Sequence, residues 1–117
     1  MRLYGYRRCS TCREAQKTLE ANGAKVEFHD IVEHAPSEET IRFWVKQSQR
    51  PISDFINTRG TVYRDKGLKT ANLSEDEWIV QLAQEGKLIK RPILVTARDE
   101  VLVGYHEGAY RRLALGE

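Results

Sequence analysis

Near its N-terminus the sequence reads Arg2-Leu3-Tyr4-Gly5-Tyr6-Arg7-Arg8-Cys9-Ser10-Thr11-Cys12. Residues 2–6 are short and rich in Tyr and Leu, which is typical of a first strand. From about Thr11 to Ala21 the apolar residues recur at helical spacing, and Asn22-Gly23 then supplies a C-terminal stop. The two cysteines therefore lie at the junction of a predicted strand and a predicted helix.

The rest of the chain predicts an α/β fold. Apolar and polar residues alternate over Lys25–His29, which indicates a second strand, and Pro92–Ala97 is a dense β-branched run. Arg98-Asp99 turns the chain into a partner strand, Val101–Val103, and a last helix is expected over Glu107–Leu115. Two strands joined through a helix are usually parallel. We expect a thioredoxin-like core, a four-stranded mixed sheet with flanking helices.

A helical block is predicted between the β-α-β unit and the C-terminal hairpin, at about residues 36–87. Ser37 is a predicted N-cap, and Ser74 with Glu77 is a predicted capping box. A short helix is expected over Ile52–Asn57, after which Thr58-Arg59-Gly60 breaks the helical pattern. The block is an insert, and residues 1–117 are predicted to form one domain.

Composition narrows the class of protein. The hydrophobic share of 40% and the charged share of 31% are typical of a globular chain rather than a disordered one. A net charge of +2 gives no reason to expect direct nucleic-acid binding. The start has no apolar stretch like a signal peptide, and no run could span a membrane. We therefore expect a cytoplasmic protein, and nothing in the sequence indicates more than a monomer.

The spacing of Cys9 and Cys12 indicates thiol chemistry. At a helix N-terminus, unpaired backbone N–H groups and the helix dipole favour the thiolate of Cys9, which is the nucleophilic form. Cys12, one turn further on, is placed to resolve a mixed disulfide on Cys9. Arg7, Arg8 and Arg13 add positive charge nearby.

Two other uses of the cysteines remain open. Zinc would need two further ligands, and His29, His34 and His106 show no metal-ligand spacing. No metal is therefore predicted. Cys12 could instead be an inert core residue, which would leave Cys9 as a single reactive thiol.

Two basic motifs are further candidates. In Lys90-Arg91-Pro92 the proline begins the β-branched strand predicted over Pro92–Ala97. There it either faces the dithiol or is a plain strand-start residue. Arg59 interrupts the helical block, where it either points to the cysteines or lies in a surface loop.

Ordered motifs along nearly the whole chain resemble the ArsC/Spx/YffB family of arsenate-reductase-like proteins. They include Leu3-Tyr4-Gly5, Cys9 through Cys12 with Arg13, Phe28-His29-Asp30, Asn57-Thr58-Arg59-Gly60, Leu88-Ile89-Lys90-Arg91-Pro92 and Val103-Gly104-Tyr105 with Tyr110. The resemblance also implies the thioredoxin-like core with a helical insert.

The resemblance implies a thiol-disulfide oxidoreductase that uses glutathione as co-substrate, with no bound cofactor. Cys9 matches the family's nucleophile, and Arg59 and Arg91 would hold an anionic partner, while Pro92 would shape the substrate edge. Arsenate reductases of this type hold the oxyanion with three arginines. In this sequence Arg91 matches one of the three arginines. The second position is Asn57 and the third falls near Gly104, so true arsenate reduction is not expected. Glutathione or a glutaredoxin- or thioredoxin-type protein would be the reductant.

An alternative from the same resemblance is a Spx-type regulator. Such proteins sense oxidants through Cys-x-x-Cys and bind the C-terminal domain of the RNA polymerase α subunit. Pro51 stands about where they carry a glycine at the polymerase contact, and the sequence ends at Glu117, before their longer C-terminal tail.

Overall fold

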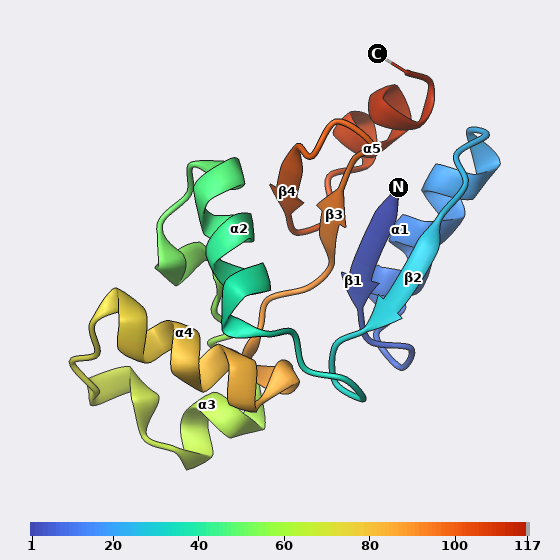
Figure 1. Ribbon diagram of the computed structural model, residues 1–117. Helices are drawn as coiled ribbons and strands as arrows, with labels where there is room; N and C mark the ends of the chain where they lie inside the picture. The colour runs from blue at the N-terminus through green and yellow to red at the C-terminus, as the bar shows by residue number, and fades with distance from the viewer. Residues whose placement is uncertain (117) are drawn as a thin grey trace.

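A four-stranded mixed sheet forms the centre of the protein (Figure 1). The computed structural model describes residues 1–116, and Glu117, the last residue of the predicted domain, lies outside the described residues. The strands are β1 (Arg2–Gly5), β2 (Glu27–Asp30), β3 (Ile93–Val95) and β4 (Val101–Val103), in the order β2-β1-β3-β4. β1 pairs in parallel with β2, whereas the other two pairings are antiparallel. The predicted thioredoxin-like sheet is confirmed.

Two helices cover one face of the sheet. Helix α1 (Ser10–Ala21) connects β1 to β2, and α5 (Glu107–Ala114) packs beside it (Figure 1). A strand sends alternate side chains to opposite faces. On this face Leu3 and Leu94 meet Ala15, Leu19 and Tyr110, all of which are fully buried.

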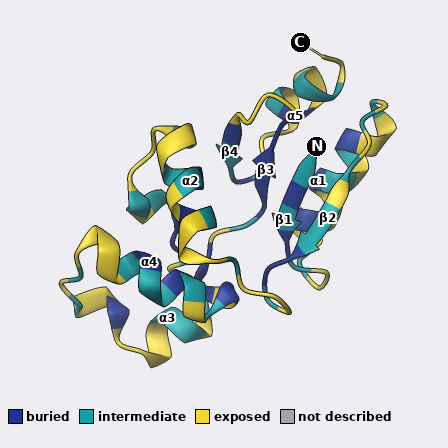
Figure 2. Ribbon diagram, viewed as in Figure 1, coloured by how far each residue is buried: buried dark blue, intermediate teal, exposed yellow. Residues whose placement is uncertain are grey.

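The other face packs against the helices that the chain forms between β2 and β3. Ile93 and Val95 join a larger core with Trp44 and Phe55 on this side. Figure 2 shows that β3 is buried. These helices are α2 (Glu38–Ser48), α3 (Thr61–Asp65) and α4 (Glu75–Gln84), with 3₁₀ turns over Ile52–Phe55, Leu68–Thr70 and Gly86–Leu88. The predicted helical insert is thus present.

The predicted caps of the insert are confirmed. The Ser37 hydroxyl accepts a hydrogen bond from the Thr40 N–H and starts α2. At α4, the Ser74 hydroxyl accepts from the Glu77 N–H, and the Glu77 carboxylate accepts from the Ser74 N–H. Each cap satisfies N–H groups that the helix itself leaves without partners.

Several predicted boundaries were wrong. Helix α3 and the turn at Leu68–Thr70 were not predicted, and β3 ends at Val95 rather than Ala97. The predicted helix over Ile52–Asn57 is only a 3₁₀ turn, because the residues after it pair with residues 88–90. Ile56 forms an antiparallel bridge with Ile89, and the Asn57 N–H donates to the Leu88 carbonyl at 2.8 Å.

Residues 1–116 contain no helix that is both long enough and apolar enough to cross a membrane.

Candidate active site

Cys9 occupies the N-cap position of helix α1. Its backbone is extended (φ −88°, ψ 115°), and its N–H donates to the Tyr6 carbonyl at 3.0 Å in a tight turn after β1. The side chain is partly exposed and makes no capping hydrogen bond of its own. Its sulfur is therefore accessible next to the positive end of a helix, where negative charge is favoured.

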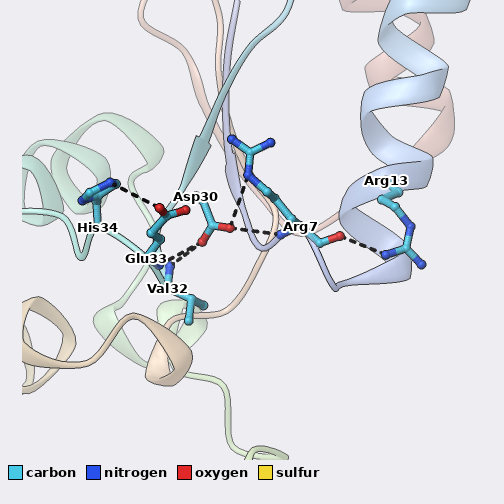
Figure 3. A network of polar contacts seen from close by, with 6 residues as sticks. All are labelled: Arg7, Arg13, Asp30, Val32, Glu33 and His34. Atoms are coloured by element: carbon cyan, nitrogen blue, oxygen red, sulfur yellow. Dashed lines mark hydrogen bonds and ion pairs between the residues drawn. The ribbon is translucent and has the colours of Figure 1, made fainter.

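Asp30 anchors the turn that carries Cys9 (Figure 3). This buried carboxylate at the end of β2 accepts hydrogen bonds from the N–H groups of Arg7, Val32 and Glu33 at 3.0–3.3 Å. Burial alone would favour the neutral acid, but these donors and the Arg7 charge outweigh it and lower the pKa of Asp30. The charged carboxylate thus ties the ends of β1 and β2 together.

Arg7 and Arg13 point into this anchoring network (Figure 3). The Arg7 side chain lies 3.8 Å from Asp30, and the Arg13 guanidinium donates to the Arg7 carbonyl at 2.9 Å. Both arginines were predicted to add positive charge near Cys9. In the structure they hold the turn in place.

Cys12 is fully buried beneath Cys9. Its sulfur packs on Gly5, where an added Cβ would lie only 2.7 Å from Cys12 Sγ. Burial raises the pKa of Cys12 to about 12, with a further contribution from the neighbouring Cys9, and the Tyr6 N–H opposes this only in part. Cys12 is therefore a thiol at neutral pH and can donate a hydrogen bond.

The pKa of Cys9 is shifted in the opposite direction. Desolvation works against its ionisation, but hydrogen bonds from the Cys12 side chain and N–H, together with the hydrogen bond and charge of Arg91, outweigh it and lower the pKa of Cys9. The two thiols thus differ in role: Cys9 is the stronger acid, and Cys12 stabilises its thiolate.

Arg91 lies next to Cys9 and is held in place by Tyr6 and Lys87. Its guanidinium lies over the Tyr6 ring, 5.3 Å from the ring centroid, and donates to the Lys87 carbonyl at 3.4 Å. The peptide bond from Arg91 to Pro92 is cis, and Pro92 is buried at the start of β3. Arg91 is the arginine that reaches Cys9.

Arg59 lies apart from this group. It is exposed in the loop before α3, and its N–H donates to the Asn57 side chain at 3.3 Å. The structure thus brings Cys9, Cys12 and Arg91 together, with Pro92 next in the chain, whereas no described contact links Arg59 to the cysteines.

A groove of about 560 Å³ lies next to the cysteine segment, with Thr11, from between the two cysteines, in its wall. Its walls come from α1, the residues around Asp54, the segment before β3 and the turn after β4. They include Thr11, Arg50, Asp54, Lys90, Arg91 and His106. A groove of this size accommodates a molecule larger than a single oxyanion.

Within residues 1–116 no three His, Cys, Asp or Glu side chains gather in a way that could hold a metal ion. No chemical role for Gly5 was predicted from the sequence. Gly5 stood only within a family motif, and its packing on Cys12 depends on three-dimensional proximity that local sequence does not encode.

Removing Arg91 should make Cys9 a weaker acid. In Arg91→Met the thiolate loses a positive neighbour and a hydrogen-bond donor, so the pH midpoint of Cys9 alkylation is expected to rise. Iodoacetamide labelling rates against pH, read by intact mass, measure this. Arg59→Met is the control and should leave the midpoint in place. Equal midpoints in the two variants would contradict the assigned role of Arg91.

Fold and site together define a class: a thioredoxin-like α/β protein with two neighbouring free cysteines at the start of its first helix. The chain belongs to the ArsC family, whose model matches residues 4–113.

Individual relatives agree with this assignment. The uncharacterized protein YusI of Bacillus subtilis is 39% identical over 110 residues, with 92% of each chain covered. The global transcriptional regulator Spx of Lactiplantibacillus plantarum is 24% identical, with 94% of this chain and 83% of that protein covered. The family thus includes relatives described as regulators.

Solved structures show the same fold. An ArsC family related protein from Bacteroides fragilis superposes with a TM-score of 0.88 at 36% identity, covering 96% of this chain and 95% of that one. A possible arsenate reductase from Streptococcus mutans gives a TM-score of 0.81 at 38% identity, with 90% of each chain covered. The protein is therefore similar both to arsenate-reductase-like proteins and to Spx.

Proposed function

We propose that the protein is a glutathione-dependent thiol-disulfide oxidoreductase in which Cys9 attacks and Cys12 resolves. One observation carries the proposal: the partly exposed Cys9 lies at the N-cap of α1 with the buried Cys12 as its neighbour. This arrangement lowers the pKa of Cys9 and raises the pKa of Cys12 to about 12. A nucleophilic thiolate next to a protonated thiol is the starting state for thiol-disulfide exchange.

The first step forms a mixed disulfide. The Cys9 thiolate attacks one sulfur of a disulfide substrate, the substrate's S–S bond breaks, and one half leaves as a thiolate that takes a proton from water. The other half stays bonded to Cys9. Arg91, next to Cys9, and Arg59, in the loop before α3, would hold an anionic partner through charge-assisted hydrogen bonds. Pro92 would shape the edge that the substrate meets.

The second step uses Cys12. Once Cys9 is bonded to the substrate it carries no negative charge, so one of the causes of the high pKa of Cys12 is removed. Cys12 then loses its proton to solvent and attacks the Cys9 sulfur, and the second half of the substrate leaves as a thiolate. The product is a Cys9–Cys12 disulfide. Two equivalents of glutathione, or a glutaredoxin- or thioredoxin-type dithiol, restore the two thiols. Such a cycle suits the reducing cytoplasm.

Replacing Cys12 with serine should trap the intermediate. With glutathione disulfide, Cys12→Ser is expected to gain one glutathione on Cys9 and keep it, because no resolving thiol remains. Intact mass after acid quenching measures the adduct, and the unmodified protein should instead lose two hydrogens. Failure of Cys12→Ser to accumulate any adduct would contradict this order of events.

A second candidate function is a redox-switched regulator that binds the C-terminal domain of the RNA polymerase α subunit. The similarity to Spx favours it, and a Cys9–Cys12 disulfide would be the switch. Against it stands the rigid Pro51 directly before the 3₁₀ turn at Ile52–Phe55. Pull-down with the isolated α domain in dithiothreitol and in diamide tests this function. Binding in neither redox state would exclude it.

A further inference from the structure

We infer that Tyr6 is a positioning residue of the candidate active site, because its aromatic ring holds the Arg91 guanidinium at Cys9 and leaves the guanidinium charge uncompensated. The inference rests on the proposed thiol-disulfide exchange and adds a residue to its machinery. Three observations carry it: the contacts that Tyr6 makes with the site, the weakness of the other restraints on Arg91, and the charges around Arg91.

Tyr6 connects the three members of the site. It directly follows β1 and is half-buried. Its carbonyl accepts a hydrogen bond from the Cys9 N–H at 3.0 Å, and its own N–H donates to the Cys12 sulfur. Its ring lies beneath Arg91, with 5.3 Å between the ring centroid and the guanidinium carbon. The main-chain contacts do not need an aromatic side chain, so substitutions of Tyr6 that keep the backbone test the ring alone.

The Tyr6 ring belongs to the site rather than to the interior of the fold. Tyr4, two residues earlier, packs against the larger hydrophobic core, and its ring meets Trp44 edge-on at 4.9 Å. Tyr6 is a member of neither core cluster of the described chain. Loss of its ring should therefore disturb Arg91 more than it disturbs folding.

The other contacts of the Arg91 guanidinium are weak. Its hydrogen bond to the Lys87 carbonyl measures 3.4 Å, longer than the range of about 2.7–3.2 Å that is usual for N–H donors. The Arg91 Nε atom is buried and has no hydrogen-bond partner among residues 1–116. A guanidinium is attracted to the negative face of an aromatic ring. The Tyr6 ring is thus the contact best able to orient Arg91.

The ring orients Arg91 without cancelling its charge. Arg7 lies 3.8 Å from the Asp30 carboxylate and Arg50 lies 3.7 Å from that of Asp54, whereas Arg91 enters no ion pair within the described residues. A carboxylate beside Arg91 would compensate the guanidinium, but a neutral ring does not.

The positive charge of Arg91 is therefore directed at Cys9. The titratable and charged side chains that act on Cys9 are Cys12, from α1, and Arg91, from the segment before β3. An opposite charge nearby favours the thiolate. Any change that lets the guanidinium move away should consequently make Cys9 a weaker acid, even though Tyr6 itself carries no charge.

The pH midpoint of Cys9 alkylation by iodoacetamide, read by intact mass, tests the role of the ring. Tyr6→Leu and Tyr6→Gln both remove the ring and are expected to shift the midpoint upward, toward but not beyond that of Arg91→Met. Tyr6→Phe keeps an aromatic face and should retain the midpoint of the unmodified protein. Tyr63→Leu makes the same change at a half-buried tyrosine of α3 and should also leave the midpoint in place.

A double variant shows whether Tyr6 acts through Arg91. In the Arg91→Met background Tyr6→Leu should add no further shift, because the group that the ring positions is already gone. A full additional shift there would overturn the inference. So would midpoints of Tyr6→Leu and Tyr6→Gln equal to that of the unmodified protein.

A parallel measurement separates this inference from the proposed function. Each protein is mixed with hydroxyethyl disulfide, a neutral probe, and adducts are counted by intact mass after acid quenching. Below the alkylation midpoint, Tyr6→Leu should react more slowly than Tyr6→Phe, because less of its Cys9 is thiolate. If the unmodified protein is alkylated at Cys9 but reacts with no disulfide, exchange is wrong. If it exchanges and Tyr6→Leu exchanges equally fast, exchange stands and the role of Tyr6 is overturned.

Discussion

Cys9→Ser is expected to abolish disulfide exchange, lowering the rate on the order of a thousandfold or more, because a serine hydroxyl stays protonated where the thiol ionises. Cys9 is the accessible sulfur of the pair, and the hydrogen bonds and charge around it act to stabilise its thiolate. Single-turnover reaction with glutathione disulfide, followed by intact mass, measures the loss.

Cys12→Ser is the matched control for this experiment. It removes a sulfur at the same site but leaves the attacking thiol, so the first exchange should continue at a measurable rate. Its rate also reports on the hydrogen bond that Cys12 gives to Cys9. Full activity of Cys9→Ser together with loss of activity in Cys12→Ser would assign the attack to the buried cysteine and refute the mechanism.

Gly86→Ala is expected to lower the free energy of unfolding by about 3 kcal/mol or more, at the upper end for overpacking in a core. A Cβ on this buried glycine would lie 1.7 Å from the Ile31 carbonyl oxygen and 2.6 Å from its carbon. Both are backbone atoms, so no side chain can move aside to relieve the clash. Urea unfolding followed by circular dichroism gives the change.

Gly108→Ala is the control, because it makes the same chemical change in an open setting. Gly108 lies in α5, and its added Cβ would come only within 3.5 Å of the flexible Arg112 side chain. Replacing a helical glycine by alanine there should stabilise the protein by roughly 0.5–1 kcal/mol. Equal stability of the two variants would show that the segment after β2 and the turn at Gly86–Leu88 are not in close contact.

The sheet and its first helix could be predicted because their signals are local. The Tyr- and Leu-rich start, the helical spacing up to Leu19 and the β-branched run before Ala97 each mark one element. The caps at Ser37 and Ser74 depend on residues three positions apart, and both were predicted. Patterns within one turn or one strand determine these features.

The folding of the insert depends on contacts between distant segments, which local patterns do not show. The conformation of Gly86 does not require glycine, because its φ is not positive. Glycine is needed because the backbone of Ile31, more than fifty residues earlier, lies against it. Similarly, Ile56 leaves the predicted helix because it pairs with Ile89.

The candidate site also combines features that local sequence predicts with features that depend on the fold. The cysteine pair at the start of the helix could be predicted from spacing alone, as its position in α1 shows. The choice among the arginines could not, because Arg7, Arg13 and Arg59 are the same residue type as Arg91 and differ only in where the fold places them.

A redox titration in glutathione buffers tests most directly whether Cys9 and Cys12 work as a pair. The protein is equilibrated over a range of potentials, free thiols are alkylated, and intact mass counts them. The account predicts that both thiols are lost together, as one intramolecular disulfide, within the range of cytosolic thiol couples at about −200 to −300 mV. Loss of Cys9 alone to a glutathione adduct, with Cys12 still reduced, would contradict the paired mechanism.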